Sequence, residues 1–288
     1  MPDLSTYVGI VATAWDGSFG RDAVRLHAGR DHDVVLVGTA AAFRFPRHER
    51  AREALPREVA ALAQLRDPGV LLPEVFLDRS DAPLGRAFVG QRFLDGDHLD
   101  PAAVDAVGAM AYRFADEIAR VLDALAEVPI DGDLATTLAN APLRATFPDL
   151  AGAIRDDLFD RLSPAGRSRA AGELDAAVAA AASAPATELV HGDFTGANLL
   201  WDADETRLTG VLDWAQVHVG DPAYDLASLA TTYGWDLVAT IEAASVRHDG
   251  TRLDRARAYA ATFALQTAYG ARTACDEEVT AAALRGYA

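Results

Sequence analysis

The chain contains no lysine, so all 26 of its basic residues are arginines. It has a single cysteine, Cys275, which excludes an internal disulfide and any cysteine metal cluster, and its seven histidines show no metal-ligand spacing. No apolar run reaches the roughly 18 to 20 residues that a membrane-spanning helix needs, and the N-terminus does not resemble a signal peptide. We therefore expect a cytoplasmic protein in which arginine must do whatever work lysine does elsewhere.

Basic charge is also scarce, because 43 acidic residues against 26 arginines give a formal net charge of -17. This charge repels polyanions and argues against nucleic acid or an anionic membrane surface as a partner. Residues 1–94 hold 12 acidic residues and 12 arginines, whereas residues 95–288 hold 31 acidic residues and 14 arginines. The acidic excess of the C-terminal part either keeps the protein in solution or attracts a cationic ligand.

Half of the 288 residues are hydrophobic, which is enough for a sizeable core and excludes a disordered or fibrous chain.

The N-terminal part alternates short β-rich runs with turns. Runs at 23–26, 34–37 and 41–45 predict a three-stranded antiparallel meander, and a fourth strand is expected at 86–94. Pro56 predicts the first residue of the intervening helix.

The C-terminal part is predominantly helical from Pro101 onward. The alanine-rich stretch 176–186 predicts a helix that ends before Pro185, and Asp221-Pro222 predicts the start of another. Short β-rich runs lie between these helices, at 189–190, 198–201 and 209–212. We therefore expect an α+β protein with a sheet-rich N-terminal lobe at residues 1–94 and a helical C-terminal lobe at 95–288.

One constellation carries recognisable chemistry. His191-Gly192-Asp193 is followed by Asn198, and Asp213 stands at the end of a short apolar strand. Phosphoryl transfer from a nucleotide needs a carboxylate that orients the attacking hydroxyl, together with oxygen ligands for magnesium. The spacing fits the catalytic loop and the metal-binding aspartate of kinases.

These residues resemble the aminoglycoside phosphotransferase family, or antibiotic kinases, whose catalytic loop reads His-Gly-Asp where protein kinases have His-Arg-Asp. The resemblance covers nearly the whole chain. It is strongest to the family members that act on the cyclic peptides viomycin and capreomycin, at residues 190–193, 198–201, 220–227 and 262–266. Residues 43–48 are more similar to aminoglycoside 2''-phosphotransferases, and residues 212–214 also occur in macrolide kinases. The resemblance implies a protein-kinase-like two-lobed fold.

The resemblance also implies roles for the residues of the C-terminal motifs. Asp193 would be the catalytic base or the carboxylate that orients the hydroxyl, and Asn198 and Asp213 would hold Mg²⁺. His191 would brace the catalytic loop. Asp221 and Asp225 would support this loop or cap the helix that follows them, and for Asp221 a plain helix cap is an equal alternative.

In the N-terminal lobe, Arg44 stands where the family usually has a phosphate-binding lysine, and Glu58 would be its partner. Arginine keeps the charge and binds phosphate through two N–H groups, but its planar fork differs from a lysine ammonium. The turn around Gly29 occupies the place of the phosphate-covering loop, although a plain hairpin is an equal alternative. Residues 91–94, including Gln91 and Phe93, would connect the lobes and meet the purine of ATP or GTP.

An acidic surface on the C-terminal lobe is expected to bind a cationic substrate. The candidates are acidic or aromatic residues that also suit helix starts or a helical core: Asp276, Glu277, Glu278, Asp156, Asp157, Asp160, Tyr269 and Trp235. We expect an enzyme that phosphorylates a hydroxyl of a tuberactinomycin peptide or an aminoglycoside and so confers resistance. The alternatives are a macrolide 2'-phosphotransferase, a small-metabolite kinase and a catalytically dead nucleotide-binding protein.

Overall fold

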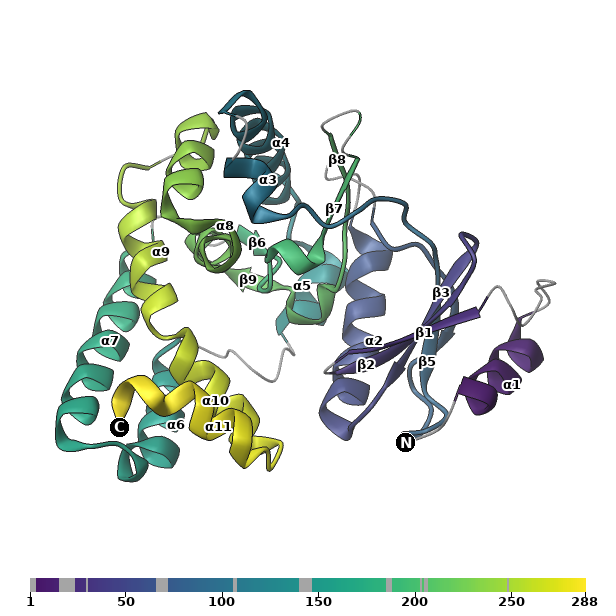
Figure 1. The fold of residues 1–288 in the computed structure, drawn as a ribbon, viewed down its shortest axis with the longest axis horizontal. Helices are drawn as coiled ribbons and strands as arrows, with labels where there is room; N and C mark the ends of the chain where they lie inside the picture. The colour runs from purple at the N-terminus through teal and green to yellow at the C-terminus, as the bar shows by residue number, and fades with distance from the viewer. Residues whose placement is uncertain are drawn as a thin grey trace.

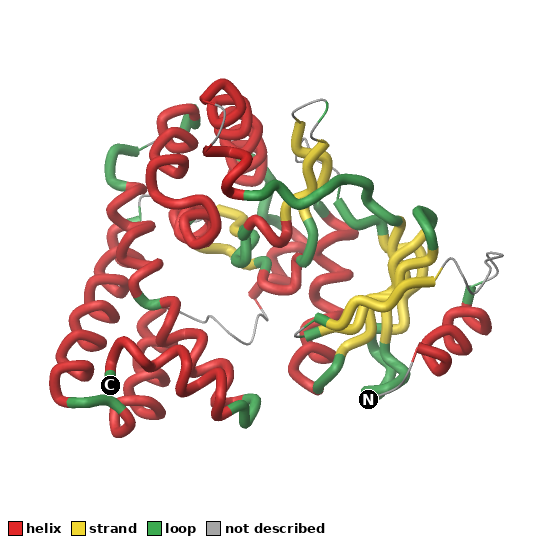
Figure 2. Tube along the Cα trace, viewed as in Figure 1, coloured by secondary structure: helices red, strands yellow, loops and turns green. Residues whose placement is uncertain are grey.

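The computed structural model describes residues 4–15, 24–29, 31–65, 72–105, 108–139, 147–184, 188–202, 204, 207–247 and 249–288. An antiparallel sheet with a helix on each side forms one lobe, and helices with two small sheets form the other (Figure 1). Figure 2 shows most of the strands gathered in one lobe and most of the helices in the other. The structure therefore has the predicted α+β class.

The N-lobe sheet has the strand order β1-β2-β3-β5-β4, and each neighbouring pair is antiparallel. The predicted meander is confirmed as β1, β2 and β3, except that Ala23 lies outside the described residues. The strand expected at 86–94 is the shorter β5. The bounds in this lobe are α1 (Leu4–Ala14), β1 (Val24–Ala28), β2 (His32–Val37), β3 (Ala41–Pro46), α2 (Glu49–Gln64), β4 (Val75–Arg79) and β5 (Phe88–Arg92).

The two faces of strand β3 have different functions because side chains alternate along a strand. Phe43 and Phe45 are buried in a core cluster with Tyr7 and Val11 of α1. Arg44 lies between them in sequence and contacts Glu58 of α2, so its side chain is on the opposite face. This alternation presents one cation on the face of the sheet that meets α2.

The prediction that Pro56 starts a helix is wrong. Helix α2 begins at Glu49, and Pro56 lies inside it. The helix is instead capped by His48, whose Nδ1 accepts a hydrogen bond from the backbone N–H of Ala51 at 3.2 Å. The cap and the partly buried first turn stabilise α2 by more than is lost with the one backbone hydrogen bond that Pro56 cannot donate.

The C-lobe is mainly helical, as expected, and its small sheets pair β6 with β9 and β7 with β8. Across the described residues, no helix is both long and apolar enough to cross a membrane. The bounds are α3 (Pro101–Asp105), α4 (Gly108–Ala126), α5 (Gly132–Ala139), α6 (Phe147–Leu158), α7 (Pro164–Ser183), β6 (Glu188–Val190), β7 (Leu199–Asp202), β8 (Arg207–Val211), β9 (His218–Gly220), α8 (Ala223–Ala244), α9 (Arg252–Ala261), α10 (Phe263–Thr273) and α11 (Glu277–Ala283).

The last residues of the chain pack against the start of α7. Tyr287 is buried in a cluster with Leu174 and Leu265, and its carbonyl oxygen accepts a hydrogen bond from the Ser163 backbone N–H at 3.1 Å. A Cβ atom added at Gly166 would lie 1.9 Å from that carbonyl oxygen. The close approach therefore requires glycine at this position of the helix.

Two alanine substitutions in α7 are expected to have opposite effects. Gly166→Ala should lower the free energy of unfolding by about 1–3 kcal/mol, because the new methyl group forces the chain end away. Gly172→Ala should raise it by about 1 kcal/mol, because nothing lies within 4 Å of the added atom and alanine favours the helix. Urea unfolding measures both values, and an equal response of the two variants would contradict this packing.

Candidate active site

The predicted catalytic loop follows strand β6 and closes on itself through Asn198. The Asn198 side-chain N–H group donates to the Asp193 carbonyl oxygen at 2.8 Å and to Asp193 Oδ2 at 3.1 Å. The backbone N–H of Thr195 also donates to the Asp193 carbonyl, at 2.8 Å. These bonds fix the Asp193 carboxylate relative to the amide five residues further on.

His191 joins this loop to the segment that carries Asp213. Its Nε2 lies 2.9 Å from the carbonyl oxygen of Leu212, which only accepts, so Nε2 carries a proton. Its Nδ1 then accepts the backbone N–H of Asp193 at 3.2 Å. Burial lowers the pKa of His191 to about 4, so the ring is neutral at physiological pH.

Asp225, in the first turn of α8, holds the start of the loop from below. Its Oδ2 accepts the backbone N–H of His191 and its Oδ1 that of Gly192, both at 2.9 Å. The carboxylate is almost fully buried, and these two charge-assisted hydrogen bonds compensate for the lost hydration. Asp225 thus positions the loop without being aimed at a substrate.

Asp213 follows strand β8 with a left-handed backbone, φ 56° and ψ 73°. Its Oδ1 accepts a hydrogen bond from Arg44 Nη2 at 2.9 Å, while Arg44 Nη1 pairs with Glu58 Oε1. Burial opposes ionisation of Asp213, but the positive charge of Arg44 outweighs it and holds the pKa of this carboxyl below its usual value. The structure therefore brings three sequence-predicted residues from β3, α2 and the end of β8 into one cluster.

The residues expected to bind magnesium have the donor atoms that the ion needs. Both hydrogen bonds of the Asn198 side chain use its nitrogen, which leaves the amide oxygen as an acceptor. The Asp213 carboxylate is ionised, and its side chain is 38% exposed. Within the described ranges, no three His, Cys, Asp or Glu residues form a metal cluster, and magnesium bound to nucleotide commonly takes only one or two protein ligands.

The structure places Asp221 away from this loop's hydrogen bonds. It accepts from the backbone N–H of Ala223 at 3.1 Å, from Arg255 Nε at 2.8 Å and from the Tyr259 hydroxyl at 3.0 Å. These partners lie at the start of α8 and in α9. Asp221 therefore bonds to the start of α8 and ties it to α9. Of the two alternatives for Asp221, this contact resembles the helix cap more than the support of the catalytic loop.

The residues expected around the nucleotide lie along the N-lobe sheet. Gly29 donates its backbone N–H to the His32 carbonyl at 2.9 Å and closes the turn between β1 and β2, of which Arg30 is outside the described residues. Gln91 is buried on β5 opposite Ala42, so it shares a sheet face with Arg44. Phe93 follows β5, and its backbone N–H lies 3.5 Å from the Ala40 carbonyl oxygen.

The expected substrate-binding residues make contacts among the C-terminal helices. Asp276 caps α11 by accepting the Val279 backbone N–H at 3.1 Å, and Glu277 pairs with Arg161 at 2.7 Å. The remaining candidates are either exposed or engaged elsewhere: Glu278, Asp156 and Asp160 are exposed, Asp157 pairs with Arg272, Trp235 lies under Arg257, and Tyr269 packs on a core cluster. Their role in binding a substrate stays a prediction.

Two residues near Arg44 were missed by the sequence reasoning. Arg57 of α2 donates to the carbonyl oxygen of Ala215, directly after the Asp213 turn, and His32 Nδ1 lies 3.5 Å from Arg44 Nη2. The one sequence feature that could have pointed to Arg57 is its position next to Glu58. Glu58 Oε1 accepts the backbone N–H of Trp214 at 3.3 Å, so helix α2 holds the segment after Asp213 through the neighbouring side chains of Arg57 and Glu58.

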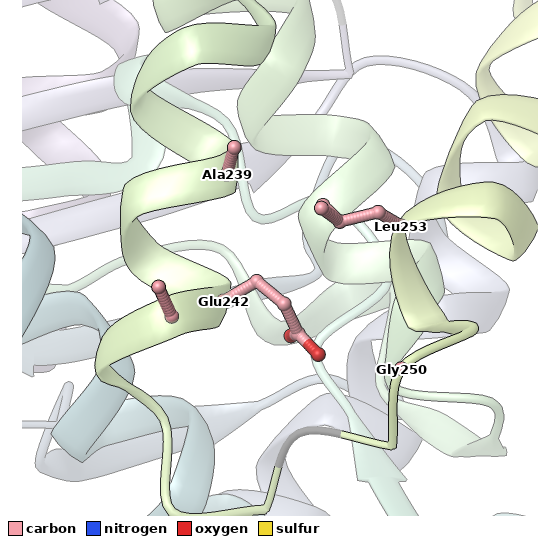
Figure 3. Close-up of a pocket in the computed structure, with 5 residues that line it drawn as sticks. Ala239, Glu242, Gly250 and Leu253 are labelled. Carbon is pink, nitrogen blue, oxygen red and sulfur yellow. The ribbon is translucent and has the colours of Figure 1, made fainter.

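A cavity of about 380 Å³ lies between the end of α8 and the start of α9 (Figure 3). Figure 3 shows Glu242 reaching from α8 toward the segment that carries Gly250 and Leu253. Glu242 pairs with Arg252 at 3.1 Å. None of the described residues that line this cavity belongs to the catalytic loop or the Arg44 cluster, so it is separate from the candidate active site.

Comparison with known proteins decides the family. The family model described as the phosphotransferase enzyme family, APH, matches residues 22–261. The chain belongs to this family. It is 33% identical over 273 residues to viomycin phosphotransferase of Streptomyces vinaceus, with 91% of each chain covered.

Solved structures of phosphotransferases share the fold. The GDP complex of aminoglycoside 2'-phosphotransferase-IIIa matches with a TM-score of 0.84 and 21% identity, over 98% of this chain and 96% of that chain. The macrolide 2'-phosphotransferase of Brachybacterium faecium matches with a TM-score of 0.72 and 22% identity, over 98% of each chain. The expected kinase-like arrangement, an antiparallel-sheet N-lobe with a helical C-lobe, is thereby confirmed; the boundary after Leu94 stays a prediction.

The buried His191 should make the stability of this phosphotransferase depend on pH. Its pKa is about 4 in the folded chain against 6.5 in the reference state, so the unfolded chain binds the proton more tightly. Stability is then full above pH 6.5 and falls as the pH drops toward 4, by about 2 kcal/mol between pH 7 and pH 5. His191→Gln should lose less stability than the wild type over that interval in urea unfolding. Identical pH slopes for the two proteins would show that His191 is not buried in its neutral form.

Proposed function

We propose that this protein transfers the γ-phosphoryl group of ATP or GTP to a hydroxyl group of a cationic antibiotic. Tuberactinomycin peptides such as viomycin and capreomycin are the favoured substrates, and aminoglycosides come next. The observation that carries the proposal is the 33% identity to viomycin phosphotransferase over 91% of both chains. The closed loop of Asp193 and Asn198 beside His191 supports it.

In the proposed reaction the oxygen of the substrate hydroxyl attacks the γ-phosphorus. A new O–P bond forms, the bond from the γ-phosphorus to the β–γ bridging oxygen breaks, and the nucleoside diphosphate leaves. Asp193 orients the hydroxyl and accepts its proton as the new bond forms. The side-chain N–H of Asn198 keeps this carboxylate in place, since it contacts both the carbonyl and Oδ2 of Asp193.

Asn198 and Asp213 would hold magnesium through the amide oxygen and the carboxylate. When bound, the ion would offset the negative charge of the phosphates. Arg44 would bind the phosphates from the N-lobe, because it is the buried cation that already contacts Asp213. Glu58 pairs with one edge of its guanidinium and Asp213 with the other, so Arg44 is held beside the carboxylate proposed to bind magnesium.

Both nucleotides remain candidates. One related solved structure holds GDP and another holds ATP with streptomycin; these ligands were bound by those proteins and not by the present chain. For the present chain, the buried Gln91 shares the sheet face of Arg44 and would lie beside the purine. The acceptor is expected to be cationic because the whole acidic excess lies in residues 95–288.

Growth of a sensitive bacterial host tests the proposal. Expression should raise the inhibitory concentration of viomycin or capreomycin, or of an aminoglycoside such as kanamycin, while the Asp193→Asn variant should give no protection. Protection against a macrolide alone would favour macrolide phosphorylation instead. No protection against any of them, with a folded protein in the cells, would contradict an antibiotic substrate.

Asp193→Asn should lower kcat by about 10²–10⁴-fold, because the substrate hydroxyl loses its proton acceptor. The Kd for the nucleotide should stay within about twofold, since Asp193 acts on the other substrate. Asp81→Asn, an exposed carboxylate between β4 and β5, is the matched control and should behave as the wild type. Stopped assays of nucleoside diphosphate release and calorimetric titration provide the two measurements. Turnover near the wild-type rate would rule out the role given to Asp193.

Arg44 should affect nucleotide binding through its charge. Arg44→Lys is expected to keep the nucleotide KM within a few-fold, whereas Arg44→Met should raise it at least tenfold, a loss of about 1.4 kcal/mol. Arg44→Met also leaves Glu58 buried without its partner, which costs about 3–5 kcal/mol of stability.

The double variant Arg44→Met with Glu58→Met separates the two effects of Arg44. Removing both charges should restore part of the stability, because Glu58 is no longer buried without a partner, although Asp213 still lacks Arg44. The high nucleotide KM should remain. A nucleotide KM that returns to the wild-type value in this double variant would contradict a direct phosphate contact by Arg44.

A further inference from the structure

Helix α8 is broken in its middle, beside the catalytic loop. Gly234 has φ 76° and ψ 172°, which is not helical, and the two halves of α8 run in different directions (Figure 1). The first half begins with the turn that holds Asp225, and it ends with Thr232 and Tyr233. The break therefore comes directly after Thr232 and Tyr233, which are the last two residues of the first half.

Both of these side chains touch the turn between Asp193 and Asn198. The backbone N–H of Gly196 donates to Thr232 Oγ1 at 3.1 Å. A Cβ atom at Gly196 would lie 2.6 Å from Thr232 Cγ2 and 2.7 Å from the Tyr233 hydroxyl oxygen. The turn and the end of the half-helix are thus in direct contact, and only glycine allows this approach.

Thr232 Oγ1 accepts a backbone N–H for which the turn's own N-cap residue provides no side-chain acceptor. Residues Gly196–Asn198 form a single 3-10 turn, and Thr195 at its N-cap makes no side-chain cap hydrogen bond. The first N–H groups of a helical turn have no partner within it and need an acceptor from elsewhere. Thr232 caps the turn from a distant helix, whereas the neighbouring Thr231 hydroxyl bonds the Ser228 carbonyl of its own helix at 2.7 Å.

We propose that Thr232 is a positioning residue for phosphoryl transfer, which fixes Asp193 and Asn198 by capping the turn between them. The inference rests on the proposed function of that loop. The Gly196–Asn198 turn ends at the residue whose amide holds the Asp193 carboxylate, so a shift of Gly196 moves both the base and a magnesium ligand. Displacements of about 1 Å at such groups lower turnover by up to about a hundredfold.

Three threonine variants of α8 test this role in phosphoryl transfer to viomycin. Thr232→Val keeps the shape of the side chain but removes the acceptor, and it should lower kcat about tenfold with the nucleotide KM within twofold. Thr232→Ser restores the hydroxyl and should return kcat to within twofold of the wild type. Thr231→Val is the matched control and should leave kcat unchanged. A kcat of Thr232→Val within twofold of the wild type overturns the proposal.

A double-variant cycle tests the contact itself. Gly196→Ala should lower kcat more than tenfold because its methyl group meets Thr232 Cγ2. Thr232→Ser removes that methyl carbon, so the loss from Gly196→Ala should be smaller in the Thr232→Ser background, although the Tyr233 contact remains. Equal losses in the two backgrounds would overturn the contact between Gly196 and Thr232, because independent sites add.

The two proposals fail in different ways. If the wild type transfers no phosphoryl group to viomycin, capreomycin or kanamycin, the proposed function fails. The positioning role is then judged by the exchange of the Gly196 amide hydrogen, followed by NMR, and by magnesium-dependent hydrolysis of ATP and GTP. Faster exchange and slower hydrolysis in Thr232→Val than in Thr232→Ser support the role. Equal exchange in wild type and Thr232→Val, or equal hydrolysis in Thr232→Val and Thr232→Ser, overturns it even where transfer is absent.

Discussion

The site depends first on one buried guanidinium group. Arg44 is 8% exposed and lies between Glu58 of α2 and Asp213 at the end of β8, so it joins the N-lobe sheet, its helix and the C-lobe. A buried charge is tolerated only where it is paired and hydrogen-bonded, and here each edge of the guanidinium faces a different carboxylate. A lysine ammonium cannot reproduce this planar two-sided arrangement. Because the chain contains no lysine, an arginine stands at the site where phosphate is expected to bind.

The catalytic loop is held by buried polar groups rather than by apolar packing alone. His191 and Asp225 together bond to the loop's backbone and to the strand segment that precedes Asp213. Inside the protein such hydrogen bonds are strong, and a network in which each partner is satisfied has a single favourable geometry. The loop thus presents Asp193 from a rigid support, which suits a reaction whose rate depends on the position of the attacking hydroxyl.

Sequence reasoning recovered what depends on local pattern. The meander at β1–β3, the helical C-lobe and the family followed from alternation, helical spacing and the His191-Gly192-Asp193 motif. The misplaced start of α2 reflects burial and capping that outweigh the cost of Pro56. Strands β4 and β9 and helix α1 were missed, because short elements are defined by tertiary pairing more than by their own residues. No short sequence pattern predicts the contact of Thr232 with Gly196, because it depends on where helix α8 breaks.

The proposed phosphoryl transfer is tested most directly by incubating the purified protein with magnesium, ATP or GTP, and each antibiotic in turn, and by measuring product mass. Viomycin, capreomycin, kanamycin and a macrolide form the panel, with a simple amino alcohol as the metabolite control. We expect a gain of one phosphoryl group on a tuberactinomycin or an aminoglycoside, in step with the release of nucleoside diphosphate. Nucleotide binding without any phosphorylated antibiotic, or phosphorylation of the amino alcohol alone, would contradict the account.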